Sequence, residues 1–258
     1  MDVRVDHITP LHIAAFAIRQ CWQSQGKSDT ETEYVCDKCG SMDIEYNIGD
    51  DNMNECRDCF TSKVSLQTVC GPNDLALIDR IGNKFKHAST LEHITINFTI
   101  NGVSRALLQE LARHRMASPS VKSTRYTLKE LKDEEPFTRF IPDGIESVEG
   151  AIERAKKYVI EVDGAIDIGV LFALDRIRIK LAQGVANDKA KYCLPESYKT
   201  DLAWTINARS LQNFLSLRSS KAALWEIRQL AQALFDALPE QYKYLFEDHI
   251  NKETNESN

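Results

Sequence analysis

The sequence has no long hydrophobic run. No apolar stretch approaches the roughly 20 residues that a membrane-spanning helix needs. The first residues, MDVRVDHITPLHIAAF, lack the basic segment and long apolar core of a secretory signal. We therefore expect a cytoplasmic protein with no membrane partner. In a reducing compartment, paired spacings among the 7 cysteines indicate metal binding rather than disulfides.

The chain also lacks an excess of positive charge, with 32 lysines and arginines against 38 acidic residues. Its formal net charge is −6 at pH 7, which argues against a general nucleic-acid-binding protein, so any basic site must be local. We find no internal repeat. A length of 258 residues and a hydrophobic content of 43% allow one domain with a sizeable core, or one domain that carries a small insert.

Apolar periodicity indicates a mixture of helices and strands, that is, the α+β class. A helix that opens at Thr9-Pro10 and ends at Gly26 is expected to bury Ile13, Phe16, Ala17 and Cys21. The other predicted elements are a strand over 94–100, a turn at Asn101-Gly102, a helix over 103–115, a long helical region over 146–183 broken by Gly164 and Gly169, a strand around 202–206 and helices over 208–217 and 220–237.

Positive charge is concentrated in one stretch, ARHRMASPSVKSTRY, residues 112–126. A helix over 103–115 would present Arg113, His114 and Arg115 at its C-terminal end, where cations are favoured even without a ligand. The following segment, read as a loop, adds Ser118, Ser120, Lys122, Ser123, Thr124 and Arg125. Arginine forks together with hydroxyls suit a phosphate or pyrophosphate, and guanidinium groups also stack on flat rings. The residues by themselves therefore indicate an anionic, nucleotide-like ligand.

Residues 31–63 differ in composition from the rest, with nine acidic against three basic residues. Cys36-x2-Cys39 and Cys56-x2-Cys59 have the spacing of a four-thiolate zinc ribbon, and Gly40 permits the tight turn of such a site. Redox disulfides are the alternative. Acidity argues against nucleic-acid binding, so we expect a small structural ribbon. Cys21 and Cys193 lie in apolar contexts and are expected in the core, whereas the sequence assigns no role to Cys70.

The basic stretch resembles the signature of the flavin-dependent thymidylate synthases, Arg-His-Arg-x7-Ser, which here is Arg113-His114-Arg115 followed by Ser123. Three further segments are similar to that family in the same order: HASTLEH (87–93), LPESYKT (194–200) and WTINARSLQNFLSLR (204–218). The resemblance covers the chain outside about 27–70. The segment with the four paired cysteines is not usual in the family, so the resemblance implies nothing about its role.

The resemblance implies the fold of that family, a mixed sheet with long helices, over residues 1–258. The spacing of the cysteines, independently of the resemblance, predicts that residues 31–63 are a zinc-ribbon-like insertion within it. It implies reductive methylation of dUMP to dTMP, in which methylenetetrahydrofolate supplies the carbon, FAD carries the hydride and NADPH reduces the flavin. It also implies a homotetramer with shared active sites. Two other readings stay open, a flavoenzyme that modifies another pyrimidine nucleotide and a nucleotide- or nucleic-acid-binding module.

Site residues follow from the resemblance, position by position. Arg218 is expected to face the pyrimidine as the catalytic residue, because charge must develop on the ring. The residues expected to bind dUMP are Gln109, Arg113, Ser123, Thr124, Arg125, Lys191 and Arg218. Those expected to bind FAD are His87, Ser89, Arg113, His114, Arg115, Asn207, Arg209 and Asn213, with Ser89 reaching a neighbouring subunit's flavin. The expected metal ligands are Cys36, Cys39, Cys56 and Cys59.

Purely structural readings of some of these residues remain. Ser123 could cap a turn, Asn207 and Asn213 could cap helices, and His87 could be an ordinary structural histidine. Two departures from the family pattern also matter. Ser120 and Val121 replace a common Asn-Glu pair, which removes one carboxylate contact. Lys191 replaces a common arginine, which keeps the charge but loses the bidentate fork.

Overall fold

The computed structural model describes residues 1–45 and 54–250. The chain divides into two compact units, which are treated separately: unit 1 comprises Met1–His7 and Ile96–Asn258, and unit 2 comprises Ile8–Thr95. No helix of the described residues is long and apolar enough to cross a membrane.

Unit 1 is built on a sheet with the strand order β1-β6-β10-β7. The strands are β1 (Asp2–Ile8), β6 (Thr95–Ser104), β7 (Ala117–Val121) and β10 (Lys199–Asn207). The alternating pattern predicted strands over 94–100 and 202–206, and both are confirmed. Ile96, Phe98 and Ile100 are buried on one face of β6, as are Leu202, Trp204 and Ile206 on β10. The predicted α+β class is therefore present.

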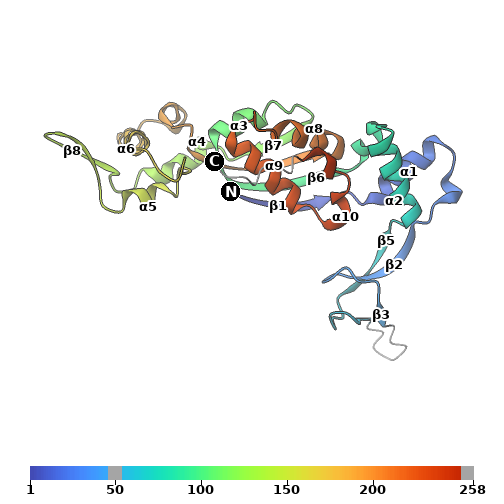
Figure 1. The fold of residues 1–258 in the computed structure, drawn as a ribbon. Coiled ribbons are helices and arrows are strands. Elements are labelled where there is room, and N and C mark those ends of the chain that lie inside the picture. Colours follow the sequence, from blue (N-terminus) through green and yellow to red (C-terminus); the bar gives the residue numbers. More distant parts are fainter. Residues whose placement is uncertain (46–53, 251–258) are drawn as a thin grey trace. The chain divides into compact units, whose positions relative to one another are not determined.

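Helices pack beside this sheet (Figure 1). They are α3 (Arg105–Leu111), α8 (Ala208–Arg218), α9 (Trp225–Ala237), α10 (Glu240–Lys243) and the short η6 (Glu247–His249). The ring of Trp204 packs between Phe98, in a tilted contact, and Phe214, in an edge-on contact, with centroids 6.4 Å and 5.1 Å apart, and these contacts join β6 and β10 to α8. The helix predicted over 208–217 is confirmed, whereas the one predicted over 220–237 begins only at Trp225.

The chain does not turn at Asn101-Gly102, so that prediction was wrong. Gly102 has a φ of +70° and its N–H donates to the Asp201 carboxylate on β10 over 2.9 Å, so the dipeptide distorts the strand without reversing it. Strand β6 therefore continues to Ser104, whose hydroxyl accepts the N–H of Leu107 and caps α3. The helix predicted over 103–115 is consequently shorter at both ends.

The predicted loop after the Arg-His-Arg motif was also wrong in part. Ala117–Val121 form β7, which pairs antiparallel with β10 and sets Pro119 opposite Trp204. Proline is tolerated here because β7 is at the end of the strand order and has a neighbour on one side only. The loop hydroxyls of Ser118 and Ser120 therefore belong to an edge strand.

A second core of unit 1 surrounds α6. Its elements are α4 (Thr124–Thr127), η4 (Leu128–Leu131), β8 (Thr138–Ile141), β9 (Gly144–Ser147), α5 (Ala151–Ala155), α6 (Ile168–Ala182), α7 (Asn187–Ala190) and η5 (Lys191–Cys193). Leu128, Phe137, Leu171, Leu174 and Ile177 are among its buried side chains. The helical region predicted over 146–183 is interrupted more widely than expected, because Asp163 and Gly164, with φ of 52° and 74°, turn the chain between α5 and α6.

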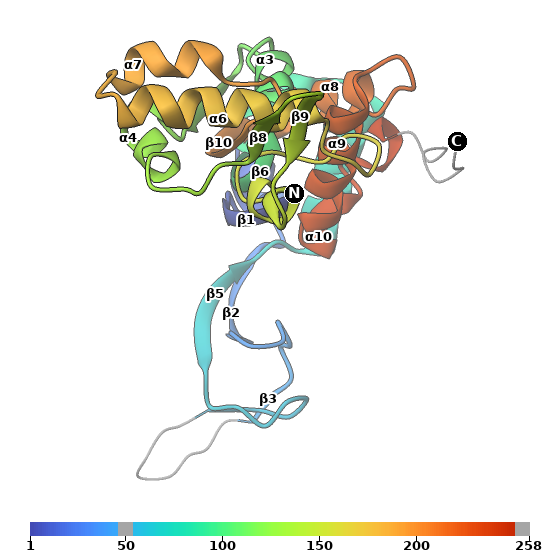
Figure 2. The ribbon, with the colours of Figure 1, turned by 90° about the vertical axis from the view of Figure 1, so that its left-hand side faces the viewer.

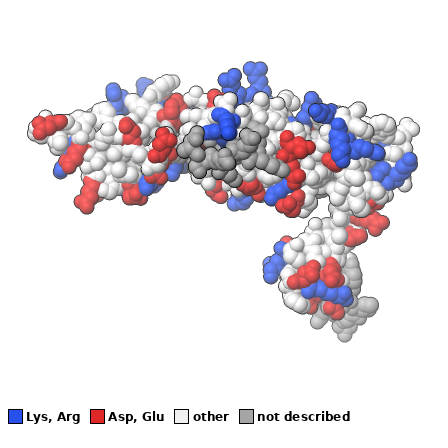
Figure 3. All heavy atoms as spheres, in the orientation of Figure 1, with Lys and Arg blue, Asp and Glu red and all other residues white. Residues whose placement is uncertain are grey.

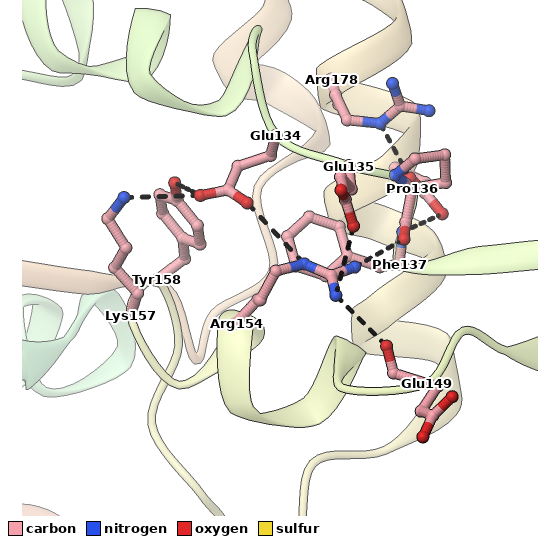
Figure 4. Close-up of polar contacts among 10 residues, drawn as sticks. Glu134, Glu135, Pro136, Phe137, Glu149, Arg154, Lys157, Tyr158 and Arg178 are labelled. Atoms are coloured by element: carbon pink, nitrogen blue, oxygen red, sulfur yellow. Dashed lines mark hydrogen bonds and ion pairs between the residues drawn. The ribbon is translucent and has the colours of Figure 1, made fainter.

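Polar contacts close this second core (Figure 4). Arg154 donates to the Pro136 carbonyl over 2.7 Å, and its guanidinium lies 5.5 Å from the centre of the Phe137 ring. The Tyr158 hydroxyl donates to Glu134 over 2.5 Å. Burial and this carboxylate raise the pKa of Tyr158 well above its usual range. These side chains bind one another, which identifies the cluster as structural.

Unit 2 contains α1 (Leu11–Cys21), η1 (Gln25–Lys27), α2 (Pro72–Ile78), the π-helical turn η2 (Asp79–Lys84) and η3 (Ala88–His93). A buried ion pair links the first and third of these, because Arg19 donates to Asp74 over 2.5 Å. Ser28 and Thr30 donate to the other Asp74 oxygen. Burial opposes ionisation of Asp74, but these donors outweigh it and lower its pKa below the usual value.

The predicted buried face of the first helix was wrong. The structure buries Leu11, Ala14, Ala15, Ile18 and Arg19, and leaves Ile13, Phe16 and Cys21 exposed. The helix also ends at Cys21, five residues before Gly26, which lies in η1. The apolar positions of this helix fit two faces, and the small residues Ala14 and Ala15 determine which face packs. Cys193 is half-buried against the second core of unit 1.

The cysteine segment stands at the end of a two-stranded ribbon (Figure 2). Strands β2 (Glu31–Cys36) and β5 (Val64–Val69) pair antiparallel from Glu31 opposite Val69 to Cys36 opposite Val64. Beyond them, the two-residue strands β3 (Ile44–Glu45) and β4 (Glu55–Cys56) pair with each other. The pairing of β2 with β5 thus brings the two ends of the cysteine segment together.

Candidate active site

Arg218 lies at the centre of a polar cluster in unit 1. From the last turn of α8 its Nε donates to His114 Nε2 over 2.9 Å, and its Nη1 donates to the Glu110 carboxylate over 2.8 Å. Its Nη2 also donates to the Glu110 carbonyl over 3.3 Å. The Arg218 side chain is 16% exposed. Two sequence motifs that are 104 residues apart therefore meet, and the guanidinium is fixed in orientation.

Glu110 was missed by the sequence reasoning, which chose its neighbour Gln109. Gln109 is exposed and donates to both oxygens of Glu196 over 3.0 Å. Helix phase could have separated the two positions, since each residue advances the helix by about 100°. Leu107 and Leu111 are buried, so residue 110 lies beside their face and residue 109 lies nearly opposite. No sequence signal identified the partner of Glu110.

His114 is a neutral acceptor in this arrangement. Its Nε2 accepts from Arg218, and its ring packs edge-on against Phe214 with centroids 4.8 Å apart. Burial lowers the pKa of His114 below 6.5, and the nearby cations Arg218 and Arg113 lower it further, against the opposing effect of Glu110. Arg113 and Arg115 flank it and are both exposed, in the turn that follows α3 rather than in its last turn.

A second group of predicted residues gathers where α4 packs against α7. Ser123 occupies the N-cap position of α4, but its side chain makes no capping hydrogen bond. Thr124 is half-buried and Arg125 exposed, while Lys191 follows directly after α7. Asn187 on α7 donates to the Arg125 carbonyl over 2.8 Å. Within residues 1–45 and 54–250, no hydrogen bond or ion pair connects Ser123, Arg125 or Lys191 to Arg218.

The third group lies along α8. Asn207 caps this helix, because its side-chain oxygen accepts the N–H of Ser210 over 2.8 Å. Arg209 and Asn213 are both exposed and four positions apart, so they share one face of the helix. Leu211, Phe214 and Leu215 form the opposite, buried face. Asn207 therefore caps a helix, which was the structural role considered for it. Its side-chain oxygen is used in the cap, whereas its side-chain nitrogen can donate to a ligand.

His87 and Ser89 belong to unit 2 and are both exposed. His87 directly precedes η3, its N–H donates to the Ile81 carbonyl, and its own carbonyl accepts the N–H and the hydroxyl of Thr90. The His87 backbone is thereby held while its ring stays accessible.

Four sulfur atoms form a second candidate site, a metal centre. The Sγ atoms of Cys36, Cys39, Cys56 and Cys59 all lie within 4.8 Å of one another. Cys36 and Cys59 are 3.5 Å apart, as are Cys39 and Cys56. A tetrahedral zinc ion with bonds of about 2.3 Å places its sulfurs about 3.8 Å apart. The donor set and its dimensions fit zinc.

The two halves of this centre repeat one backbone pattern. The Gly40 N–H donates to the Cys36 carbonyl, and the Phe60 N–H donates to the Cys56 carbonyl in the same way. Both turns need a left-handed residue, with φ of +76° at Gly40 and +53° at Phe60. Burial opposes ionisation of Cys36, but the N–H groups of Cys39 and Lys38 and the neighbouring thiols outweigh it and lower its pKa to about 6. Burial and the other thiols raise the pKa of Cys59 to about 12.

Comparisons with known proteins agree with these motifs. Residues 5–242 match the family described as thymidylate synthase complementing protein. A flavin-dependent thymidylate synthase of Wolinella succinogenes is 50% identical over 95% of this chain and 97% of its own length. One from Campylobacter jejuni is 48% identical over 98% of this chain and 99% of its own length.

Solved structures give the same result. The fold is similar to thymidylate synthase X from Helicobacter pylori, described with FAD and dUMP, at a TM-score of 0.73 and 44% identity over 97% of this chain and all of that one. A second structure of the Helicobacter pylori enzyme with FAD and dUMP gives a TM-score of 0.74 at 46% identity and the same coverage. The Arg-His-Arg motif, its contact with Arg218 and these matches along nearly the whole chain place the protein in the family of flavin-dependent thymidylate synthases.

Proposed function

We propose that the chain converts dUMP to dTMP by reductive methylation, with methylenetetrahydrofolate as carbon donor and NADPH as the source of electrons. The observation that carries the proposal is the meeting of the two family motifs at Arg218 and His114. Names and bound ligands of the relatives support it, since the Helicobacter pylori structures are described with FAD and dUMP.

Arg218 is the proposed catalytic residue. The pyrimidine becomes reactive when negative charge can develop around N3 and its carbonyl oxygens, and a preorganised donor stabilises such charge best. Glu110 and His114 hold the guanidinium from one side. Because His114 is neutral, it adds no competing positive charge, and the free N–H groups of Arg218 are the ones available to the ring.

Binding of the dUMP phosphate is assigned to Ser123, Thr124, Arg125 and Lys191, with Gln109 and Arg113 near the nucleoside. The packing of α4 against α7 supports this grouping. It brings α4, which contains Thr124 and Arg125, close to α7, which Lys191 directly follows. The side chain of Ser123 is not used in capping, so its hydroxyl is available to a phosphate oxygen.

FAD, when bound, carries the hydride to the pyrimidine. The residues that would hold it are Arg113, His114 and Arg115 together with Asn207, Arg209 and Asn213. The shared exposed face of Arg209 and Asn213 fits a polar cofactor, as does the exposed pair of arginines around His114. We further propose that His87 and Ser89 are supplied by a neighbouring subunit, so that the working assembly is a homotetramer with shared sites.

We also propose that residues 1–258 form one catalytic domain in which residues 31–63 are an inserted zinc ribbon. Zinc held by Cys36, Cys39, Cys56 and Cys59 would stabilise this insert. In the insert, Ile44 packs with Cys36 and Cys56. This core is too small to stabilise the insert without a bound metal.

The test is a spectrum followed by an assay. Purified protein is expected to show the visible absorbance of a flavin, to bleach with NADPH under anaerobic conditions, and to form dTMP from dUMP and methylenetetrahydrofolate. UMP and dCMP, offered in parallel, test the alternative of another pyrimidine nucleotide. A protein that never takes up FAD would overturn the proposal.

A further inference from the structure

Two cations assigned to the dUMP phosphate are both bound by one residue of α7, Asn187. The side-chain nitrogen of Asn187 donates to the Arg125 carbonyl over 2.8 Å. The carbonyl of the same residue accepts the N–H of Lys191, which directly follows α7. Asn187 is half-buried between these contacts. Its two hydrogen bonds therefore link the backbones of Arg125 and Lys191, which are far apart in the sequence.

The charged ends of both side chains lie near aromatic rings. The Lys191 Nζ lies 5.9 Å from the centre of the Tyr192 ring, and the Arg125 Cζ lies 6.0 Å from the centre of the Tyr126 ring. These distances are at the outer limit of a cation–π contact, about 6 Å. Tyr192 is 85% exposed and Tyr126 71% exposed, so neither ring fills the core. Each cation thus contacts the ring of the residue that follows it.

Neither cation is neutralised by an acidic side chain. Figure 3 shows lysine and arginine interspersed with aspartate and glutamate over much of one face of unit 1, and several of these residues pair, as Lys156 does with Glu153 over 2.9 Å. Within the part of the chain that the structure describes, Arg125 and Lys191 have no such ion pair. A carboxylate would cancel the charge of its partner, whereas a ring attracts a cation and leaves its net charge available to an anion.

We propose that Asn187 and Tyr192 are positioning residues for the dUMP phosphate. Asn187 sets the spacing between the backbones of Arg125 and Lys191, and Tyr192 orients the Lys191 ammonium. The inference rests on the proposed function, which assigns the phosphate to these cations without saying what holds them. A lysine depends on such a contact more than an arginine does, because an ammonium on a flexible stem has no planar fork that matches a phosphate.

The test measures binding of dUMP, and of deoxyuridine, which lacks the phosphate, to the FAD-loaded protein. Calorimetry gives the Kd of dUMP, and competition against dUMP gives the Kd of deoxyuridine. Asn187→Ala is expected to raise the Kd of dUMP about three- to tenfold, because a hydrogen bond that holds the two cations together is lost. Tyr192→Leu should raise it about two- to fivefold, whereas Tyr192→Phe keeps the ring and should bind as wild type does.

A purely structural role would not produce the same pattern. Asn187→Ala and Tyr192→Leu should leave the Kd of deoxyuridine unchanged, and kcat at saturating dUMP should stay near that of wild type, because Arg218 is held by other residues. When Lys191 is already replaced by alanine, Tyr192→Leu should have no further effect on the Kd of dUMP. Lys189→Ala, which removes an exposed cation of α7, is the control.

Three results would overturn the proposal. The first is an unchanged Kd of dUMP in Asn187→Ala or in Tyr192→Leu. The second is an equal rise in the Kd of deoxyuridine, which would show a general structural role. The third is a Tyr192→Phe variant as weak as Tyr192→Leu, which would assign the effect to the hydroxyl. Wild type that binds no dUMP would contradict both this proposal and the proposed function, whereas wild type that binds dUMP without forming dTMP would contradict the proposed function alone.

Discussion

At the scale of single residues, the orientation of Arg218 is the feature that most depends on its neighbours. Three donor groups of its guanidinium are engaged, two of them by Glu110 and one by His114. A free arginine on a helix end would sample many rotamers, whereas this one is held before any ligand arrives. Preorganisation of this kind is the main source of electrostatic rate acceleration.

We therefore predict that Arg218→Ala lowers dTMP formation about 100- to 1000-fold while FAD content and folding are retained. Glu110→Ala should reduce turnover less, and Glu110→Gln least, because glutamine keeps an acceptor for the guanidinium. Steady-state rates and flavin absorbance measure these effects. Lys221→Ala, an exposed cation beyond α8, is the control. Turnover of Arg218→Ala within a few-fold of wild type would remove Arg218 from its catalytic role.

The lowered pKa of His114 makes a prediction about pH. Between that lowered value and the unfolded value of about 6.5, the unfolded chain binds more protons than the folded one. The free energy of unfolding should therefore fall as pH decreases below about 6.5. Urea unfolding at several pH values should find a smaller fall in His114→Gln, which cannot be protonated. If the free energy of unfolding depended on pH identically in wild type and His114→Gln, the lowered pKa of His114 would be contradicted.

At the scale of elements, the start of α3 decides where the Arg-His-Arg motif lies. Ser104 caps the helix, and buried Glu226 at the start of α9 accepts both the N–H of Ser104, over 2.7 Å, and its hydroxyl. These hydrogen bonds link the start of α3 to the start of α9. A shift of α3 by one residue would turn Glu110 away from Arg218, since each residue rotates the helix by about 100°.

We predict that Ser104→Ala destabilises the protein by about 2–5 kcal/mol, the sum of a lost cap and a buried carboxylate left with fewer donors. The matched control is Asp167→Ala, which removes an exposed cap of α6 that accepts from Gly169 over 2.7 Å. That loss should be about 1 kcal/mol. Urea unfolding compares the two variants. Equal decreases in the free energy of unfolding would show that the hydrogen bonds between Ser104 and Glu226 add no stability beyond the cap.

At the scale of the whole molecule, the candidate metal centre and the proposed catalytic residues occupy different parts of the chain. Arg218, Glu110 and His114 belong to unit 1, and the four cysteines lie at and beyond the end of the β2–β5 ribbon of unit 2. The helices that carry the proposed catalytic residues are packed by Leu107, Leu211 and Phe214, whereas the cysteine segment has its own small core of Cys36, Ile44 and Cys56. Loss of the metal should therefore remain local.

Cys36→Ser combined with Cys39→Ser is expected to abolish zinc binding and to make residues 31–63 sensitive to protease, while FAD stays bound and much activity remains. Metal analysis, limited proteolysis and the dTMP assay measure the three effects. Cys70→Ser is the control. Burial raises the pKa of the Cys70 thiol to about 11, so it is a poor ligand at neutral pH. Wild type without zinc would contradict the ribbon, and loss of flavin in the double variant would show that the insert supports the active site.

Local sequence patterns by themselves determined much of this protein. The alternation around Phe98 and Trp204 predicted two strands, the spacing of the cysteines predicted that their four sulfur atoms gather at one place, and the order of the motifs indicated the family. These features depend on neighbours in sequence, because side-chain period and ligand spacing are properties of a short segment.

Tertiary structure decided what local patterns leave open. Pairing with β10 turned the segment around Pro119 into an edge strand, and packing chose Ala14 and Ala15 as the inner face of α1 over Ile13 and Phe16. Glu110 became the partner of Arg218 only because α3 and α8 meet across 108 positions of sequence. Such contacts depend on how separate elements pack, and no window of sequence contains both sides of them.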